Sequence, residues 1–200
     1  MSSVIGITGP TGSGKSVLSS YLAGKGFVVL DCDRIYADMT KGPSACMDAL
    51  RRNFGDEIVN PEGGLDRAVM RNLVFGPGNE ERLALLNRTT HVFVTDRIRE
   101  IISEKKEPGY VIDAPLLFEA GADILCDGTI AVVAPYRTRL KRLRRRDGLP
   151  DGDIRRRMAS GHTCRWFRRM CTFTLNNRGS ERRLQRRADR YIAAITGKKQ

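Results

Sequence analysis

The chain has 200 residues, of which 40 % are hydrophobic and 29 % are charged, and its formal net charge is +12. This composition is typical of one globular domain that can bury a core. No apolar run approaches the roughly 18 residues that cross a bilayer, and the N-terminus lacks the charged and apolar regions of a signal peptide. We therefore expect a cytoplasmic protein with no membrane partner.

In chain order, the first half begins with a strand over residues 4–8, a helix over 16–23 and a strand over 27–30. Apolar residues at spacings of three and four then predict a helix that has Pro43 in its first turn. Asp66 is the expected N-cap of the next helix. A long helix follows over about 79–105.

The second half continues with strands over 110–113 and 129–134, a basic helix over 136–146 and a helix capped by Asp151. A fifth strand is expected over 172–175, and a final helix begins at Ser180. Because helices separate the strands, the fold class is α/β, with a parallel sheet covered on both faces. The chain is one domain over 1–200, with an inserted helical region at about 34–108.

Five cysteines are scattered along the chain without a CxxC pair: Cys32, Cys46, Cys126, Cys164 and Cys171. An odd, dispersed set predicts reduced thiols in an intracellular protein. The spacing of His91 and His162 fits no usual zinc site.

The stretch GPTGSGKS at residues 9–16 matches G-x-x-x-x-G-K-[ST] between a predicted strand and a predicted helix. Glycines let successive N–H groups turn inward toward an anion, and the helix N-terminus adds its dipole. Lys15 is then expected at the β- and γ-phosphates and the Ser16 hydroxyl at Mg²⁺. The alternative is a glycine-rich turn. The predicted ATP-binding segment consists of Gly9, Pro10, Thr11, Gly12, Ser13, Gly14, Lys15, Ser16 and Val17.

A GTPase is excluded because neither NKxD nor DxxG occurs, so a kinase remains. Asp31 and Asp33 follow the second strand, at the edge where open parallel sheets bind ligands. Either carboxylate could accept the proton of an attacking hydroxyl, or it could simply cap the next helix. We favour function for both, and Asp33 more strongly.

YVIDAPLLFE at residues 110–119 ends the third strand in the same way. Asp113 is a candidate for orienting Mg²⁺-bound water. The residues Pro115, Leu116 and Leu117 could form an apolar shelf beside the site, or the leucines could be ordinary core.

Together these segments make the chain resemble the dephospho-coenzyme A kinase family, which phosphorylates the ribose 3′-hydroxyl of dephospho-CoA with ATP. The resemblance runs from about Val4 to Gly179. Its most specific part is GGLDRAVMRNLVF at 63–75, with Met70 where the family has leucine. DCD at 31–33, DAPLLFE and RRDGL match further family segments in the same order.

The resemblance implies a P-loop kinase with three layers, a five-stranded parallel sheet and a basic lid over about 150–171. It makes Asp33 the general base and Arg146 a contact to the ATP phosphates. It places the CoA-binding region among the helices of the insertion. The acceptor-site residues that it implies there are Asp66, Arg67, Arg71 and His91, and it adds Asp31 and Asp33 just before the insertion.

The chain departs from the family pattern at several positions. Ala37 replaces a usual arginine, Gly161 a usual lid glutamine and Asn176 a usual aspartate. The lid segment CRWFRRMC is atypical, although Arg165, Arg168 and Arg169 supply basic side chains. These differences leave the roles of individual lid residues open.

Charge is distributed unevenly, with 21 of the 35 basic residues lying from Arg137 onward beside only 5 acidic ones. Such asymmetry suggests an anionic partner, although a solvated arginine-rich surface is the plain alternative. Two polyanionic substrates, ATP and dephospho-CoA, would supply that partner without a specific nucleic acid. A nucleoside or nucleotide kinase of the same fold and an RNA-binding P-loop protein remain as alternatives, and a monomer is favoured.

Overall fold

A computed structural model describes residues 2–76, 78–104 and 107–197. The chain divides into two compact units. The first, here called the sheet unit, consists of Met1–Leu30 and Lys105–Gln200, and the second, the helical unit, is Asp31–Glu104. In the described part of the chain, no helix is long and apolar enough to cross a membrane.

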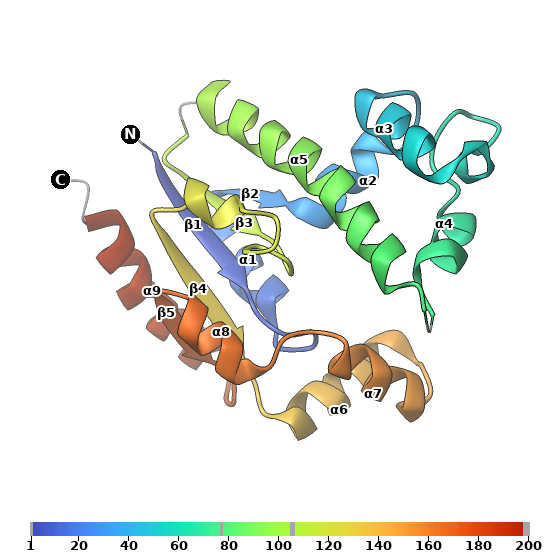
Figure 1. The fold of residues 1–200 in the computed structure, drawn as a ribbon. Helices are drawn as coiled ribbons and strands as arrows, with labels where there is room; N and C mark the ends of the chain where they lie inside the picture. Colours follow the sequence, from blue (N-terminus) through green and yellow to red (C-terminus); the bar gives the residue numbers. More distant parts are fainter. Residues whose placement is uncertain (1, 77, 105–106, 198–200) are drawn as a thin grey trace. The chain divides into compact units, whose positions relative to one another are not determined.

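The sheet is parallel and has five strands in the order β2-β3-β1-β4-β5, as Figure 1 shows. In chain order they are β1 (Ser3–Thr8), β2 (Val28–Asp31), β3 (Gly109–Asp113), β4 (Gly128–Val133) and β5 (Phe173–Asn176). In the register, Ile5 of β1 lies opposite Val111 of β3 and Gly128 of β4. β1 is buried along its whole length because it is the central strand and pairs with β3 on one side and β4 on the other. The α/β class and the parallel five-stranded sheet are confirmed.

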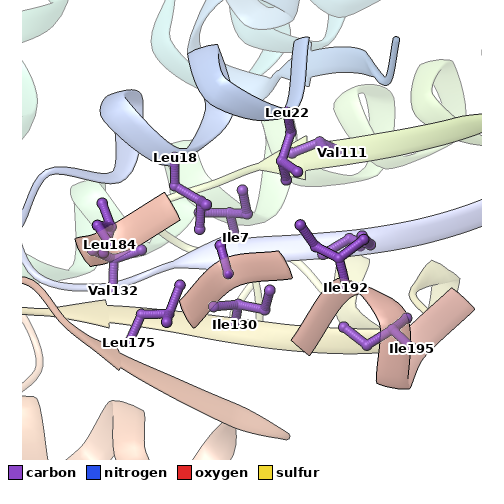
Figure 2. Close-up of a cluster of buried hydrophobic side chains, with 12 residues drawn as sticks. Ile7, Leu18, Leu22, Val111, Ile130, Val132, Leu175, Leu184, Ile192 and Ile195 are labelled. Carbon is purple, nitrogen blue, oxygen red and sulfur yellow. The ribbon is translucent and has the colours of Figure 1, made fainter. Parts of the chain in front are cut away.

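Successive side chains of a strand point to opposite faces of the sheet, so each face contributes to a separate hydrophobic core. On one face, Ile130 and Val132 of β4 pack with α1 (Lys15–Ala23) and α9 (Glu181–Thr196). Figure 2 shows this core, in which Leu18 and Leu22 of α1 and Leu184 and Ile192 of α9 meet side chains of the sheet. On the other face, Ala131 and Val133 pack against Phe167 of α8 (Cys164–Met170). The short helix η2 (Ala122–Leu125) contacts β1.

Two basic helices follow the carboxyl end of β4, namely α6 (Tyr136–Asp147) and α7 (Asp151–Ala159). They share a small apolar cluster of Leu140, Leu143, Ile154 and Met158. The expectation that Asp151 caps α7 is wrong, because Pro150 occupies the N-cap. Asp151 is instead the first helical residue, and its carboxylate pairs with Arg144 of α6.

The helical unit contains α2 (Cys32–Met39), α3 (Ala45–Phe54), η1 (Asp56–Ile58), α4 (Arg67–Val74) and α5 (Glu80–Glu104). Helix α5 contacts each of α2, α3 and α4. The unit has its own core, built from Cys46, Met47, Leu50, Ile58, Leu65, Met70 and Val74. The long helix expected over 79–105 is therefore present, and Lys105 lies outside the described residues.

Pro43 does not lie in the first turn of α3, contrary to the expectation. Ser44 is the N-cap, and its hydroxyl accepts a hydrogen bond from the Met47 N–H at 3.1 Å. Asp66 caps α4 as expected.

Candidate active site

At two positions of the loop between β1 and α1, the backbone accepts only glycine. Gly9 has φ 141°, and a Cβ on it would lie 2.1 Å from the Val132 carbonyl oxygen of β4. Gly14 has φ 96°, and a Cβ there would lie 2.3 Å from Nδ2 of Asn177. Because side chains are sterically excluded at both positions, the loop presents bare backbone.

Backbone donors gather at the same place. Helix α1 begins at Lys15 after the N-cap Gly14, which has no side chain with which to cap it, and a helix N-terminus favours an anion. In the described part of the chain, the Ser13 hydroxyl oxygen is buried and has no hydrogen-bond partner. The Lys15 ammonium donates to the Gly9 carbonyl at 2.8 Å, and the Ser16 side chain is exposed. These features suit a polyphosphate.

Two arginines of α6 hold the carbonyl groups of this loop, and the sequence analysis gave them no role. Arg139 is only 6 % exposed, and its Nε donates to the Thr11 oxygen at 2.8 Å. Arg142 Nη1 donates to the Ser13 oxygen at 2.9 Å and, more weakly, to the Gly12 oxygen at 3.5 Å. Burial lowers the pKa of Arg142 from its usual value, although a guanidinium keeps its charge at neutral pH.

Asn177 completes this group from the residue after β5. Its side chain is nearly inaccessible at 6 % exposure, and its Nδ2 donates to the Ser13 oxygen at 2.8 Å. Its own N–H donates to Val133 of β4 at 2.7 Å, and Arg142 Nη2 donates to the Asn177 carbonyl at 3.3 Å. Asn177 therefore connects the sheet to the phosphate loop. A motif pattern in one segment could not reveal this connection, since 164 residues separate Asn177 from Ser13.

Asp113 ends β3, and its Oδ2 accepts a hydrogen bond from the Ser19 hydroxyl of α1 at 2.5 Å. The carboxylate is thus attached to the helix that the phosphate loop begins. Beyond it, Pro115 and Leu116 are exposed, whereas Leu117 is fully buried. For Leu117 the alternative of an ordinary core position fits the structure. The role of the two exposed residues in an apolar shelf stays a prediction.

Arg146, the predicted phosphate contact, lies in the last turn of α6. Its Nε is 2.5 Å from Asp147 Oδ1, and Arg157 of α7 reaches the other oxygen of the same carboxylate at 3.1 Å. These contacts hold the pKa of Asp147 below its usual value, through the hydrogen bond from Arg146 first. The Arg146 side chain is exposed. To contact a phosphate, its guanidinium would either keep Asp147 as a second partner or exchange Asp147 for the phosphate.

The lid segment and Asn176, which both depart from the family pattern, lie in the sheet unit. Asn176, at the usual aspartate position, accepts a hydrogen bond from Arg168 Nη2 at 3.1 Å. His162 stacks on Trp166 with 3.7 Å between ring centroids, and its Nε2 lies 2.8 Å from Glu119. Gly161 is exposed. Cys164 and His162 therefore belong to the packing around α8.

In the helical unit, Asp31 is the last residue of β2 and caps α2, since its Oδ1 accepts from the Arg34 N–H at 3.1 Å. The capping alternative for Asp31 is thus realised in the structure. Asp33 is exposed in the first turn of α2. Its assignment as the base stays a prediction.

The other predicted acceptor residues lie on α4 and α5. Asp66 Oδ1 accepts from the N–H groups of Ala68 and Val69 at 2.9 and 3.0 Å. Arg67 and Arg71 are exposed on α4, four residues apart and hence on one face of the helix. His91 is half-buried on α5.

Comparison with known proteins gives one consistent family. The family model described as dephospho-CoA kinase matches residues 3–182. A dephospho-CoA kinase of Corynebacterium glutamicum is 33 % identical over 194 residues, covering 96 % of both chains. One of Fusobacterium nucleatum is 38 % identical over 144 residues, which cover 72 % of this chain and 73 % of that protein.

Solved structures share the fold of this chain. The crystal structure of TT1252 from Thermus thermophilus has a TM-score of 0.80 and 33 % identity, covering 96 % of this chain and 97 % of its own. A dephospho-CoA kinase from Campylobacter jejuni has a TM-score of 0.69 at 22 % identity, with both chains covered completely. A shikimate kinase from Acinetobacter baumannii, with a TM-score of 0.55 and 14 % identity over 97 % and 94 % of the two chains, shares the fold.

Proposed function

This chain belongs to the dephospho-CoA kinase family, and from that premise we propose how its residues transfer a phosphoryl group. The reaction takes the γ-phosphoryl group of ATP to the ribose 3′-hydroxyl of dephospho-CoA, the final step of coenzyme A synthesis. The observation that supports our assignment best is the phosphate loop, with two obligatory glycines and the N-terminus of α1 directly after it.

The loop and Lys15 bind and align the ATP phosphates. Phosphoryl transfer needs little covalent chemistry from a protein, and it depends on alignment and on neutralising charge. The loop N–H groups and the Lys15 ammonium would supply fixed positive charge to the β- and γ-phosphates. Lys15 would exchange its present Gly9 carbonyl acceptor for a phosphate oxygen. Arg146 is the further cation that we assign to this step.

We assign the proton of the acceptor to Asp33. As the 3′-oxygen forms a bond to the γ-phosphorus, its proton passes to the Asp33 carboxylate, and the bond to the β-phosphate oxygen breaks to release ADP. Asp33 is exposed and lies two residues after the end of β2. Asp31, whose carboxylate already caps α2, is the less suited of the two.

The residues near the loop also fit a magnesium ion. A hydroxyl on the first turn of α1 and a carboxylate at the end of β3 are the hard oxygen donors that Mg²⁺ prefers, and Ser16 and Asp113 provide them. We infer that Ser16 holds the ion and that Asp113, fixed by Ser19, orients its water. The ion would neutralise charge on the transferring phosphate.

For the acceptor, we propose that Arg67, Arg71 and His91 contact dephospho-CoA, whose pyrophosphate suits the two arginines on one face of α4. The cytoplasm is our proposed compartment, since all five cysteines are free thiols. A lid over about 150–171 would exclude water from the reacting phosphate.

The proposal is tested by Asp33→Asn, which keeps the shape but removes the basic carboxylate. Phosphorylation of dephospho-CoA should fall about 100-fold or more, as is usual for loss of a general base. ATP affinity should be unchanged, and dephospho-CoA affinity should stay within about tenfold. All three are measured on one preparation, and mass analysis should locate the product phosphate on the 3′-oxygen.

Two results would contradict parts of this assignment separately. Unchanged turnover in Asp33→Asn would make Asp33 structural and leave Asp31 as the next candidate. If the unmodified chain phosphorylated a free nucleoside but not dephospho-CoA, the acceptor would be wrong and a nucleoside kinase of the same fold would be favoured.

A further inference from the structure

We propose that Arg139, Arg142 and Asn177 are positioning residues, which hold the carbonyl groups of the phosphate loop so that its N–H groups face the ATP phosphates. This inference rests on the proposed function, because it concerns how the same loop receives ATP. None of the three lies within the phosphate-binding motif. They come to it from α6 and from the end of β5.

The geometry of the peptide bond connects these contacts to phosphate binding. In a planar trans peptide, the C=O of one residue and the N–H of the next point in opposite directions. Arg139 holds the Thr11 oxygen at 2.8 Å, so the N–H of Gly12 points away from α6. Arg142 and Asn177 hold the Ser13 oxygen at 2.9 and 2.8 Å, so the N–H of Gly14 also points away from them.

Such external support matters because the loop has great backbone freedom and few hydrogen bonds of its own. Gly9, Gly12 and Gly14 all have positive φ, and glycine has the greatest backbone freedom to lose on ordering. Within the loop, one backbone hydrogen bond is present, from the Ser13 N–H to the Pro10 oxygen at 3.2 Å. The bonds from side chains outside the loop therefore select one of its many conformations before ATP arrives, which lowers the cost of binding.

The charges of the two arginines point to the same role. On α6 and α7, Arg144, Arg146 and Arg157 each have a carboxylate partner. In the described part of the chain, Arg139 and Arg142 have no carboxylate within 4.0 Å and donate to loop and neighbouring carbonyls instead. Their charge is therefore uncompensated behind the loop, where it favours an incoming polyanion.

The test compares Arg142→Met with Arg145→Met. Methionine keeps an apolar stem but removes every donor, and Arg145 lies on the same helix, exposed and, among the described residues, without a hydrogen bond to the loop. In Arg142→Met, KM for ATP should rise about tenfold or more, since charge-assisted hydrogen bonds are the stronger kind. KM for dephospho-CoA should stay within about twofold, and Arg145→Met should match the parent in both values.

Binding measurements separate positioning from general damage. The affinity for ADP should fall in Arg142→Met, while the affinity for adenosine, which carries no phosphate, should be unchanged. Arg142→Lys, which keeps one donor and the charge, should recover part of the ADP affinity. Asn177→Ala should weaken ADP binding too, and the double variant should lose less than the product of the two losses because both side chains serve the Ser13 oxygen.

A folded Arg142→Met protein with parental ADP affinity and parental KM for ATP would overturn the inference. Equal losses of ADP and adenosine affinity would also overturn it, since they indicate a structural defect only. If Arg142→Met does not fold, Arg142→Lys and Asn177→Ala decide by the same ADP-to-adenosine comparison. That comparison needs no acceptor, so a parent chain that binds ADP but fails to phosphorylate dephospho-CoA would refute the proposed function alone.

Discussion

Lys15 is the residue whose replacement should separate catalysis from folding most clearly. Its ammonium contacts the Gly9 carbonyl at 2.8 Å and lies at the start of α1, beside the loop that we assign to the phosphates. Lys15→Ala should lower kcat about 100-fold or more, because the charge acts on the transition state, and should shift Tm little. The measurement is steady-state turnover beside a thermal melt of the parent and the variant. Near-normal turnover in a folded variant would refute the phosphate-loop assignment.

The residues of the phosphate loop could be predicted because the motif is contiguous: one strand, one loop and one helix carry all of it. Arg142 and Asn177 could not, because the order of the strands brings them to the loop. β4 pairs with β1 and β5 pairs with β4, so α6 and the residue after β5 reach the loop from far along the chain. A pattern in one sequence records spacing along the chain and contains no signal for such a contact.

At the scale of single elements, Asp66 tests whether a motif residue is structural, functional or both. Its Oδ1 accepts two N–H groups at the start of α4. Asp66→Ala should lower the free energy of unfolding by about 1 kcal/mol through loss of the cap, and Asp66→Asn should lose much less. Urea denaturation measures both. KM for dephospho-CoA in Asp66→Asn then isolates the proposed binding role, and an unchanged KM would leave Asp66 with the cap alone.

The contact between α1 and α9 should make the stability of the sheet unit depend on acid. Asp189 of α9 accepts from the Tyr21 hydroxyl at 2.8 Å and pairs with Lys25 at 2.9 Å. Partial burial raises the pKa of Asp189, but the hydrogen bonds from Lys25 and Tyr21 outweigh it and lower the pKa below 3.8.

Because this pKa is lower in the folded state, the stabilisation is present above pH 3.8 and disappears as the pH falls through the folded-state value. The difference in unfolding free energy between the parent and Asp189→Asn should therefore be constant near neutral pH and shrink in that acid range. Denaturant unfolding at several pH values measures it. A difference that grew on acidification would contradict the assignment.

The existence of the elements could be predicted from apolar periodicity, which packing preserved: Leu184, Ala188 and Ile192, spaced four residues apart on α9, are all buried. The ends of helices were less predictable. Pro43 and Asp151 both suit a helix start, yet Ser44 and Pro150 take the caps. Neighbouring residues can compete for one N-cap position. A partner elsewhere can decide which residue takes it, as the ion pair with Arg144 does for Asp151.

At the scale of the whole molecule, part of the excess positive charge lies on the outer face of α9. Its buried face carries Leu184, Ala188 and Ile192, and the arginines lie on the other side. A cavity of about 660 Å³ is lined by Arg183, Arg186, Arg187, Asp189 and Arg190. In the described part of the chain, none of these four arginines has a carboxylate within 4.0 Å, since Asp189 is engaged by Lys25. Such a surface can attract a polyanion through its charge.

We expect that RNA binds this surface only through its charge. A single-stranded oligonucleotide should bind weakly, with Kd on the order of 10⁻⁴ to 10⁻⁶ M at physiological salt, without sequence preference and with a steep loss of affinity as salt rises. Replacing Arg183, Arg186, Arg187 and Arg190 by glutamine should reduce the slope of log K against log salt by about 3, near 0.7 for each lost phosphate contact. Dephospho-CoA turnover should not change, because these side chains lie on the far side of α9 from the core that supports the phosphate loop. Fluorescence anisotropy over a salt series, beside turnover of the same variant, measures both. A tight, sequence-selective RNA complex at physiological salt would show instead that the arginines of α9 serve a nucleic-acid partner in addition to the kinase reaction.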